Sequence, residues 1–335
     1  MKRRLKVTVL LDWPCVPDDD PQLLREPRDP ATEYHVASTL RELGHHVTVL
    51  GVSDLQAMVG GLREQEPDIV FNLTEEFRGD RRHDRNLAAV LEVMGVPFTG
   101  SGSAGLMLCR SKGLCKQLLN FHRIRVPGFL ELPAGRRVRV PRTLRYPMVV
   151  KPLYEDGSEG IFNASLVRTE EALVERVRIV HERFEQPAIA EEYVAGRELY
   201  VAVLGNTRLA VLPPRELFLR QQGNGAPVLA TYSVKWNAEY REKWGVRFGF
   251  AEVSPGLMAR LARICRRVYR SLELRDYARI DLRVTPEEEI VVLEVNPNPD
   301  IAHGEDVAEA AERAGIPYPR FIQRLLRLAL ARWGA

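Results

Sequence analysis

The first hundred residues alternate between short, continuously apolar runs and longer segments with one apolar face. Three apolar runs predict buried strands, at 5–11, 46–52 and 68–73. Two segments show helical periodicity and end at a glycine, Thr32–Leu43 before Gly44 and Leu87–Met94 before Gly95. A further short strand is expected at 96–100. Continuous apolar strands that alternate with helices predict a parallel sheet with helices on both faces.

The remaining pattern divides the chain into three expected units, an N-terminal domain at 1–105, a central unit at 106–187 and a C-terminal unit at 188–335. Helices are expected at Ala104–Asn120, at Thr169–Phe184 and at 254–273. Two hairpins are expected, one joining 188–194 to 198–205 and one joining 277–284 to 289–296. Together these elements predict an α/β fold class.

Composition excludes several classes of protein. The net charge is only +3, from 48 basic and 45 acidic residues, so no nucleic-acid partner is expected. No apolar run reaches the roughly 18 residues that a membrane helix needs, and the apolar stretch after the basic start is too short for a signal peptide. The four cysteines form no CxxC pair, which favours a cytoplasmic protein without a structural zinc. Only seven residues are lysine, so each lysine is a candidate for a specific role.

The segment ARIDLRVTPEEEIVVLEVNPNPD carries the strongest chemical signal. If its two strands form a hairpin, Asp281 lies beside Glu294 and Asn296, because Glu294 and Asn296 are two residues apart and share a face. Two carboxylates and an amide oxygen suit Mg²⁺, which prefers oxygen ligands. Arg279 alternates with Asp281 and could stabilise charge on a reacting oxygen. The alternative is a polar sheet face in solvent, which the apolar neighbours argue against.

Two further segments could contact a nucleotide. In MVVKPLYEDGSEG, Lys151 ends a buried strand before a glycine loop whose N–H groups could bind phosphate; the alternative is a surface lysine at a strand end. In AIAEEYVAGREL, Glu191 or Glu192 faces a cleft and Glu198 follows a glycine turn. These acids could accept hydrogen bonds from a ribose or an amine, or they could simply lie in solvent.

Together these segments resemble the ATP-grasp superfamily and, within it, the D-alanine–D-alanine ligases. The resemblance implies a Rossmann-like N-terminal domain followed by two α+β subdomains that sandwich ATP. It is carried by GVPFTGSGSAGLMLCRSKGLCKQLL, VVKPLYEDGSEG, AEEYVAGREL, TYSVKWNAEY, ARID and LEVNPNP. Three of the seven lysines fall at the family's phosphate-contacting positions, namely Lys112, Lys151 and Lys235.

The resemblance also implies roles for the other residues. Glycine-loop residues Gly157 and Ser158 would bind phosphate. Glu191, with Glu192 beside it, would meet the adenine amine, the Tyr193–Val194 backbone would face the ring edge, and Glu198 would hold the ribose. Arg279, Lys235 and Ser158 would act at the reacting centre. Asp281, Glu294 and Asn296 would hold two Mg²⁺ ions, with Mn²⁺ as a possible substitute.

The departures from the family pattern cluster at the substrate end. The segment LDWPCVPDDDPQ lacks the family's early glycine-rich motif with its glutamate. Gly157 and Trp236 stand where the family has a serine and a tyrosine, and Asn298–Pro299–Asp300 and HGED follow the Glu–x–Asn motif. Asp18–Asp20 and His303–Glu305 could line a different amine pocket or be solvated loop residues. We therefore expect a shared nucleotide site and an altered substrate pocket.

The resulting expectation is an ATP-dependent carboxylate–amine ligase that forms an acyl phosphate and then an amide bond. The expected substrates are amino acids or short peptides, D-alanine or another, and the resemblance also implies a homodimer. The alternatives are a nucleotide-binding regulatory protein that has lost catalysis, and a dehydrogenase. The dehydrogenase is disfavoured because DWPCVP, rather than GxGxxG, follows the first strand.

Overall fold

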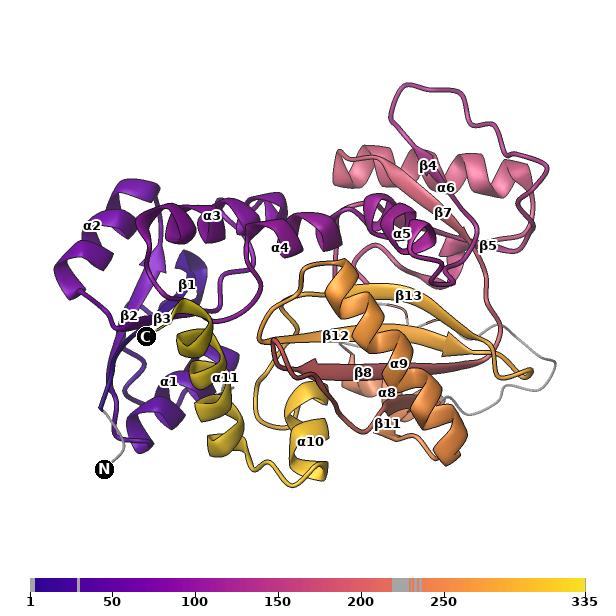
Figure 1. Cartoon of the computed structure of the whole chain (residues 1–335). Coiled ribbons are helices and arrows are strands. Elements are labelled where there is room, and N and C mark those ends of the chain that lie inside the picture. Colours follow the sequence, from indigo (N-terminus) through magenta and orange to yellow (C-terminus); the bar gives the residue numbers. More distant parts are fainter. Residues whose placement is uncertain are drawn as a thin grey trace.

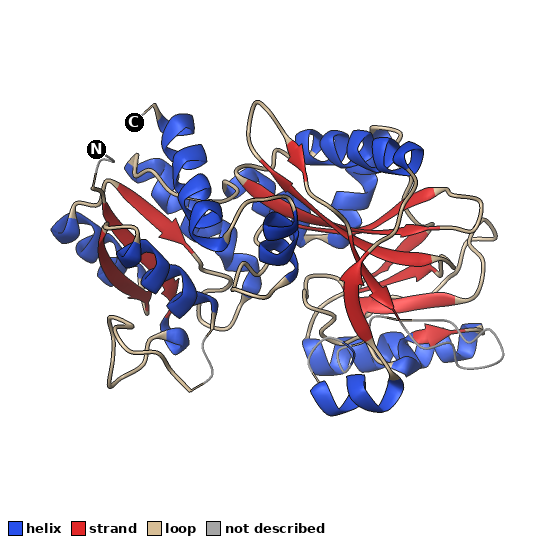
Figure 2. Cartoon of the chain, turned by 90° about the horizontal axis from the view of Figure 1, so that it is seen from below, coloured by secondary structure: helices blue, strands red, loops and turns tan. Residues whose placement is uncertain are grey.

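The computed structural model describes residues 4–28, 31–218, 229, 231, 234 and 237–334, without the side chains of residues 238, 243 and 244. Three β-sheets organise this part of the chain. The N-terminal domain forms one end of the molecule, and the central and C-terminal sheets lie together at the other end (Figures 1 and 2).

The N-terminal domain is a parallel sheet with strand order β2-β1-β3, as its apolar strands predict. Its strands are β1 (Lys6–Asp12), β2 (His46–Val52) and β3 (Ile69–Asn72). One face packs on α1 (Thr32–Glu42) and the C-terminal helix α11 (Tyr318–Trp333). The other face packs on α2 (Leu55–Gln65), α3 (Asp84–Met94) and α4 (Ser103–Arg110). The predicted parallel sheet with helices on both faces is confirmed.

The central subdomain is an antiparallel sheet with strand order β4-β7-β5-β6. Its strands are β4 (Phe129–Leu132), β5 (Met148–Pro152), β6 (Leu166–Val167) and β7 (Ala188–Glu192). Helix α6 (Glu170–Phe184) buries Leu173, Val177 and Val180 against this sheet. Helix α5 (Lys112–Phe121) lies between this subdomain and the rest of the chain (Figure 1).

The C-terminal sheet is antiparallel, with order β11-β10-β8-β12-β13 and β9 beside β8. Its strands are β8 (Arg197–Leu204), β9 (Ala210–Val211), β10 (Arg215–Phe218), β11 (Arg247–Phe250), β12 (Tyr277–Val284) and β13 (Ile290–Asn296). Its helices are α8 (Ala238–Trp244), α9 (Pro255–Ser271) and α10 (Asp306–Arg313).

The two faces of the C-terminal sheet differ in chemistry. Alternate residues such as Val201, Ile280 and Leu282 are fully buried against the apolar side of α9. The residues between them, such as Tyr200 and Asp281, point to the opposite face, because side chains alternate along a strand. The helix-covered face therefore anchors the sheet, and the other face is free to carry polar chemistry.

Several sequence expectations need correction. The strands 188–194 and 198–205 form no hairpin, because β7 pairs with β4 and β5 while β8 pairs with β10 and β12. The glycine turn between them instead joins two sheets. The expected strand at 96–100 is reduced to a single bridge between Val70 and Phe98. The helix expected at 104–120 is broken at Ser111, whose backbone is extended and whose hydroxyl caps α5 at Leu114.

Sheet pairing places the expected unit boundaries differently at two points. Strand β7, which begins at Ala188, belongs to the central sheet rather than to the C-terminal one. Helix α11 packs on the N-terminal sheet although it lies at the other end of the sequence. The chain thus returns to its first domain, which ties that domain to the C-terminal sheet.

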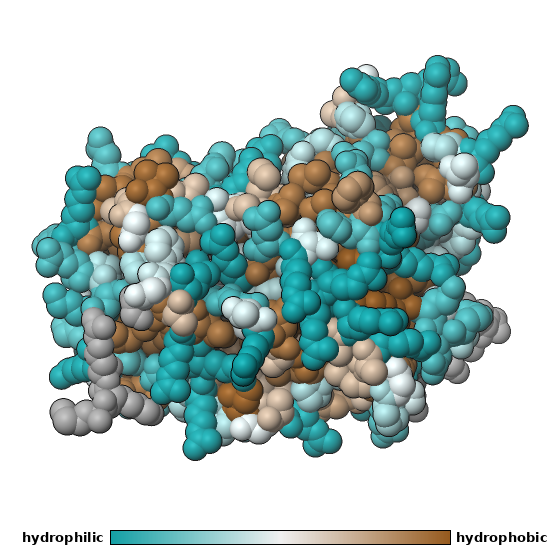
Figure 3. Space-filling view, in the orientation of Figure 1, coloured by the Kyte–Doolittle hydropathy of each residue, from teal (hydrophilic) through white to brown (hydrophobic). Residues whose placement is uncertain are grey.

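The surface is mostly hydrophilic on the face shown in Figure 3, with smaller apolar patches between charged side chains. The most exposed large apolar side chains, Val93 at 89% and Phe121 at 81%, lie on different helices, α3 and α5. Among the described residues, no helix is long and apolar enough to cross a membrane.

Candidate active site

Two neighbouring cavities open between the central subdomain, the C-terminal sheet and the N-terminal domain. The smaller, about 60 Å³, is lined by nine of the residues predicted to bind nucleotide or metal: Lys151, Ser158, Glu191, Glu192, Tyr193, Val194, Glu198, Asp281 and Glu294. The larger, about 1080 Å³, is lined by Gly157, Arg279 and Asn296 among others. The glycine loop, β12 and β13 each have one residue that lines the larger cavity and a nearby residue that lines the smaller one. We therefore treat the two cavities as one continuous candidate site.

Glu191 is held between two buried lysines at the centre of the smaller cavity. Its Oε1 lies 2.9 Å from Lys116 Nζ and its Oε2 lies 3.0 Å from Lys151 Nζ. Burial works to raise the pKa of Glu191, but the two ammonium groups outweigh it and hold that pKa below its usual value. Burial likewise works to lower the Lys151 pKa, and the Glu191 carboxylate raises it. Glu191 is 2% exposed, so the alternative of a solvent-facing acid is wrong for this residue.

Lys112 connects the helix α5 to the acidic face of the C-terminal sheet. Its Nζ lies 3.2 Å from Glu294 Oε1 and also donates to the carbonyl oxygen of Glu155 in the glycine loop. Three lysines were named in the sequence analysis, of which the structure describes Lys112 and Lys151. Both contact acidic residues of the site, Glu294 and Glu191. Lys235 and Trp236 lie outside the described residues.

Asp281, Glu294 and Asn296 share one face of the β12–β13 ladder. Asp281 stands directly opposite Glu294, and Arg279 stands opposite Asn296. The register shifts after Asp281, and the bulge at Leu293 exposes a carbonyl that accepts from Lys116 Nζ at 2.6 Å. The predicted hairpin is confirmed, and with it the expectation that these side chains lie together.

Arg279 is oriented by its neighbour on the same strand. Its Nε lies 2.7 Å and its Nη2 3.0 Å from the two oxygens of Asp281, and its guanidinium stands over the Tyr200 ring at 5.4 Å. Burial works to lower the Arg279 pKa, but Asp281 raises it well above the usual value. A fixed, permanently charged group thus faces the larger cavity.

Arg283 organises the segment that links β7 to β8. It donates to Glu198 Oε2 through Nη2 at 2.6 Å, and its Nη1 donates to the Val194 carbonyl at 2.9 Å and to the Tyr193 hydroxyl at 3.1 Å. The other Glu198 oxygen accepts from the Tyr200 hydroxyl at 2.9 Å. Tyr193, Val194 and Glu198, predicted to face the adenine ring and the ribose, are therefore held in place by a buried arginine from β12.

Glu192 lies at the rim of the same cavity. Its Oε1 accepts from the Arg145 N–H at 2.7 Å, and its own N–H donates to Gly128 O at 2.8 Å. The sequence left Glu191 and Glu192 as alternatives for the cleft-facing acid. The structure places both at the cavity, with only Glu191 paired to the lysines.

The glycine loop has the tight backbone that its sequence suggests. Gly157 and Ser158 have φ of +62° and +65°, which places both in the left-handed region. Ser158 is 7% exposed and its carbonyl accepts from the Ile161 N–H at 2.9 Å. Gly160, with φ of +72°, lies so close to Pro152 that a Cβ would approach its Cγ to 2.6 Å. The loop therefore has a defined backbone conformation.

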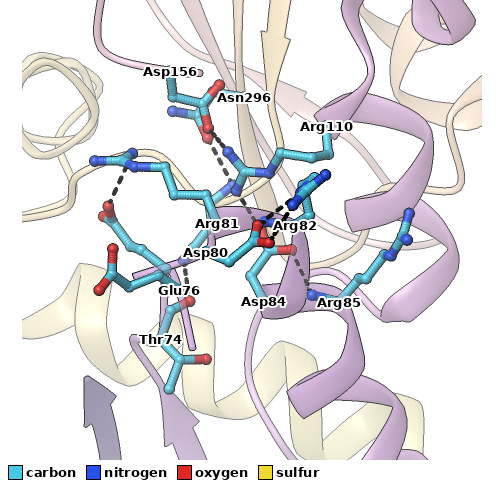
Figure 4. Close-up of polar contacts among 12 residues, drawn as sticks. Thr74, Glu76, Asp80, Arg81, Arg82, Asp84, Arg85, Arg110, Asp156 and Asn296 are labelled. Atoms are coloured by element: carbon cyan, nitrogen blue, oxygen red, sulfur yellow. Dashed lines mark hydrogen bonds and ion pairs between the residues drawn. The ribbon is translucent and has the colours of Figure 1, made fainter. Parts of the chain in front are cut away.

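Charged side chains of the N-terminal domain reach this loop (Figure 4). Arg110 makes ion pairs with Asp84 of α3 and with Asp156 of the loop. Arg81 lies 3.6 Å from Glu75 Oε2 and 3.9 Å from Glu155 Oε2.

Three carboxylates, those of Glu75, Asp300 and Glu305, line the larger cavity, which several arginines line as well. Burial raises the pKa of Glu75 to about 7, with Arg81 opposing and Asp156 adding to the shift. Half of the Glu75 side chain is accessible, but it is accessible to the cavity, where protein surrounds it on several sides. Burial also raises the pKa of Asp12 to about 6 and that of Glu305.

The two acidic segments proposed from sequence behave differently. Glu305 lines the cavity, as does Asp300 before it. Asp20 instead accepts the N–H groups of Leu24 and Arg25 and shapes its own loop, while Asp18 and Asp19 are exposed. Asp18–Asp20 thus lies outside the cavity lining.

Two residues were missed in the sequence analysis, Lys116, which pairs with Glu191, and Arg283, which lines the smaller cavity. Lys116 lies four residues after Lys112, so the two share a face of α5, and its rarity as a lysine was a further signal. Arg283 lies two residues after Asp281 and therefore shares its sheet face. Both signals were in the sequence, but the partner acids became evident only from the fold.

The donor set suits Mg²⁺. Asp281, Glu294 and Asn296 offer only oxygen, two carboxylates among them, as hard divalent cations prefer. In the part of the chain that the structure describes, no group of three or more His, Cys, Asp or Glu side chains could hold a metal ion. The set proposed here is of a different kind, because its third oxygen donor is the amide of Asn296. Arg279 and Lys112 provide the compensating positive charge in the structure.

Comparison with known proteins bears on this geometry. The family model described as D-ala D-ala ligase C-terminus matches residues 108–327. The chain belongs to the D-alanine–D-alanine ligase family. This family membership makes it an ATP-grasp ligase that forms a C–N bond.

Relatives along the whole chain agree with the family assignment. An uncharacterised protein y4sG of Sinorhizobium fredii is 33% identical over 305 residues, covering 89% of this chain and 87% of its own. A D-alanine–D-alanine ligase of Moorella thermoacetica is 29% identical over 303 residues, covering 88% and 92%. The crystal structure of D-alanine–D-alanine ligase from Bacillus anthracis complexed with ATP superposes with a TM-score of 0.76 at 18% identity, covering 98% and 99%. This similarity establishes the α/β ATP-grasp fold of the family member described here.

Proposed function

We propose that this chain uses ATP to activate the carboxylate of an amino acid or short peptide and joins it to an amine, releasing ADP and phosphate. One observation carries the proposal. Lys112 of α5 meets Glu294 on the acid and amide face of the C-terminal sheet. Lys151 of β5, paired with Glu191 of the central sheet, lines the same cavity as Glu294 and Asp281. A triphosphate needs such a set of cations beside oxygen ligands for its metal.

The nucleotide would lie between the central and C-terminal sheets. Lys112 and Lys151 would neutralise its phosphates, and the N–H groups around Gly157 and Ser158 would cover them. Lys235 is proposed for the same role by resemblance. The segment from Glu191 to Val194 would face the base, and Glu198 would accept hydrogen bonds from the ribose.

The metal would be held by Asp281, Glu294 and Asn296, as two Mg²⁺ ions with Mn²⁺ as a substitute. When bound, the metal would neutralise phosphate charge. The chain's own contribution is to keep the three oxygen donors on one rigid sheet face, which a hairpin fixes better than a loop would.

The reaction would proceed in two steps. The substrate carboxylate oxygen bonds to the γ-phosphorus as the bond to ADP breaks, giving an acyl phosphate. The amine then attacks the acyl carbon, phosphate leaves with that oxygen, and the amine gives up a proton. Arg279, aimed by Asp281, would stabilise the oxyanion formed in the second step, a role that can lower a barrier by about 3 kcal/mol.

The substrate end is proposed to select an amine other than that of D-alanine. Glu75, Asp300 and Glu305 line the larger cavity and would attract an ammonium group. A volume of about 1080 Å³ leaves room for a body larger than an alanine beside the phosphates. An amino acid with a larger side chain, or a short peptide, fits this space.

Nucleotide binding is proposed to require an opening movement. The smaller cavity measures about 60 Å³, well below the roughly 300 Å³ at which ligand pockets begin. The ion pair of Lys112 with Glu294 joins α5 to the C-terminal sheet, and the hydrogen bond of Arg283 to the Val194 carbonyl joins β12 to the segment after β7, so these contacts must separate or rearrange as the nucleotide enters. We also keep a homodimer and a cytoplasmic location as predictions.

The decisive experiment follows the fate of a labelled oxygen. The protein is incubated with Mg²⁺, ATP and pools of D- and L-amino acids and dipeptides whose carboxylates carry ¹⁸O. The proposal expects ADP, an amide and ¹⁸O in the released phosphate. AMP and pyrophosphate, or unlabelled phosphate together with amide, would refute the acyl-phosphate route. ATP binding without turnover in any pool would favour the alternative of a regulatory protein that has lost catalysis.

A further inference from the structure

The segment that joins the N-terminal domain to α5 ends in a nearly buried arginine. Arg110 is the last residue of α4, next to the helix break at Ser111 and two residues before Lys112. It is 7% exposed and lines the larger cavity. An arginine in such a place needs anionic partners, because burying an unpaired charge is unfavourable.

Its partners come from two different parts of the fold. Nη2 is paired with Asp84 Oδ2 at the start of α3, and Nη1 is paired with Asp156 Oδ2 in the glycine loop. Figure 4 shows Arg110 between these carboxylates. We name this set of Asp84, Arg110 and Asp156 the loop latch.

The electrostatics favour a closed latch. The two carboxylates raise the pKa of Arg110 despite its burial, which by itself would lower it. Burial raises the pKa of Asp84, and Arg110 opposes that shift. The carboxylates therefore favour the charged guanidinium, whose fork matches two carboxylates better than an ammonium would.

The latch acts on the residues that would cover the phosphates. Asp156 immediately precedes Gly157 and Ser158, and its carbonyl accepts from the Glu159 N–H at 3.0 Å. The residue before it, Glu155, offers its carbonyl to Lys112. Ion pairs join the loop to the N-terminal domain at two places, from Arg110 to Asp156 and from Arg81 to Glu155.

We propose that Arg110 is a positioning residue, which holds the glycine loop against the N-terminal domain through Asp156 and so keeps the phosphates and the acyl intermediate enclosed. This inference rests on the proposed ATP-dependent ligation. Enclosure matters because water that reaches an acyl phosphate hydrolyses it, and ADP is then released without amide. Loss of the latch should make the loop more mobile and raise the KM for ATP. It should also release ADP without a matching amount of amide.

The test uses Asp156→Asn, which removes the loop's charge and leaves Arg110 paired with Asp84. Arg110→Lys is the second variant, since a single ammonium keeps the charge but loses the fork that joins two carboxylates. Glu182→Gln is the matched control, because it breaks an arginine–carboxylate pair on the outer face of α6 in the same subdomain. Arg110→Met leaves the buried Asp84 and the partly buried Asp156 uncompensated and is avoided for that reason.

Three readouts separate positioning from general stability. Asp156→Asn is expected to raise the KM for ATP about tenfold, because small misplacement of phosphate-binding groups is costly. It should also raise the ratio of ADP to amide, with an unchanged Tm, and speed amide hydrogen exchange across residues 155–161. Arg110→Lys should give the same changes to a smaller extent, and Glu182→Gln should give none of them.

The outcomes also distinguish this inference from the proposed function. If the wild-type protein ligates and Asp156→Asn leaves KM, product ratio and loop exchange unchanged, the latch is overturned and the function stands. If the wild-type protein shows no turnover with any substrate, the proposed function fails. Hydrogen exchange then decides the latch alone, because faster exchange at 155–161 needs no catalysis and equal exchange overturns it.

Discussion

The Lys112 ammonium lies 3.2 Å from Oε1 of Glu294, so a cation from the start of α5 meets a carboxylate of the C-terminal sheet. Lys112 begins α5, and Glu294 lies on β13 and lines the smaller cavity. Without this convergence the lysine and the acid and amide set would be unrelated surface features. Lys112 is only 5% exposed, so its ammonium group interacts with this site rather than with solvent.

Replacing Lys112 by methionine should weaken ATP use. The phosphates would lose one charge-assisted contact, and we expect the KM for ATP to rise at least about tenfold. Steady-state kinetics of ADP release measures the change. Lys6→Met is the matched control, since Lys6 is exposed on β1, away from the cavities. An equal KM in both variants would remove Lys112 from the nucleotide site.

Replacing Lys116 by methionine should reduce stability as well as activity. Glu191 would lose one of its two cations while remaining 2% exposed, and breaking a buried pair can cost about 3 kcal/mol. Urea unfolding gives the free energy of unfolding. The double variant Lys116→Met with Glu191→Gln should recover part of the loss, because it removes the uncompensated charge. A double variant less stable than Lys116→Met would contradict this account.

Neutralising the predicted metal ligands should change the demand for Mg²⁺. We expect Asp281→Asn to raise the Mg²⁺ concentration for half-maximal activity about tenfold, since the carboxylate contributes both charge and a ligand. A titration of ADP release with Mg²⁺, repeated with Mn²⁺, provides the measurement. Because Asp281 also orients Arg279, kcat should fall too. A lower kcat with an unchanged Mg²⁺ titration would show that Asp281 orients Arg279 and does not bind the metal.

Replacing Glu75 by glutamine should stabilise the protein at alkaline pH. The folded state raises the Glu75 pKa from 4.5 to about 7, so it binds the proton more tightly than the unfolded chain does. Stability therefore falls as pH rises from about 4.5 to about 7 and then stays at the lower level. We expect a higher Tm for Glu75→Gln than for wild type at pH 8, with the difference vanishing near pH 4.5.

Thermal unfolding across this pH range tests the sign. Asp19→Asn, a change in an exposed loop, is the control. A Tm advantage of Glu75→Gln that grows toward low pH would show that the carboxylate is stabilised, rather than destabilised, by its cavity. At pH 8 the same variant should bind the amine substrate less well, because the ammonium loses its partner.

Local pattern was sufficient for most elements. The apolar runs at β1, β2 and β3 and the glycine ends of α1 and α3 follow from backbone and side-chain preferences within a few residues. The hairpin β12–β13 was also predictable, because its short turn leaves few other pairings. Where the pattern failed, the reason was long-range. Strands β7 and β8 are adjacent in sequence and join different sheets, a choice that only the packing of each sheet decides.

The sequence by itself determined the residue types, their alternation on each strand and the oxygen set on one face of the hairpin, because these depend on periodicity and short turns. Only the tertiary structure decided which charges meet. Lys116 and Lys151 flank Glu191, and Arg110 joins Asp84 to Asp156, although each pair comes from segments far apart in the chain. Ion pairing falls off within a few ångströms, and distances of that size between remote residues are set by the packed fold alone.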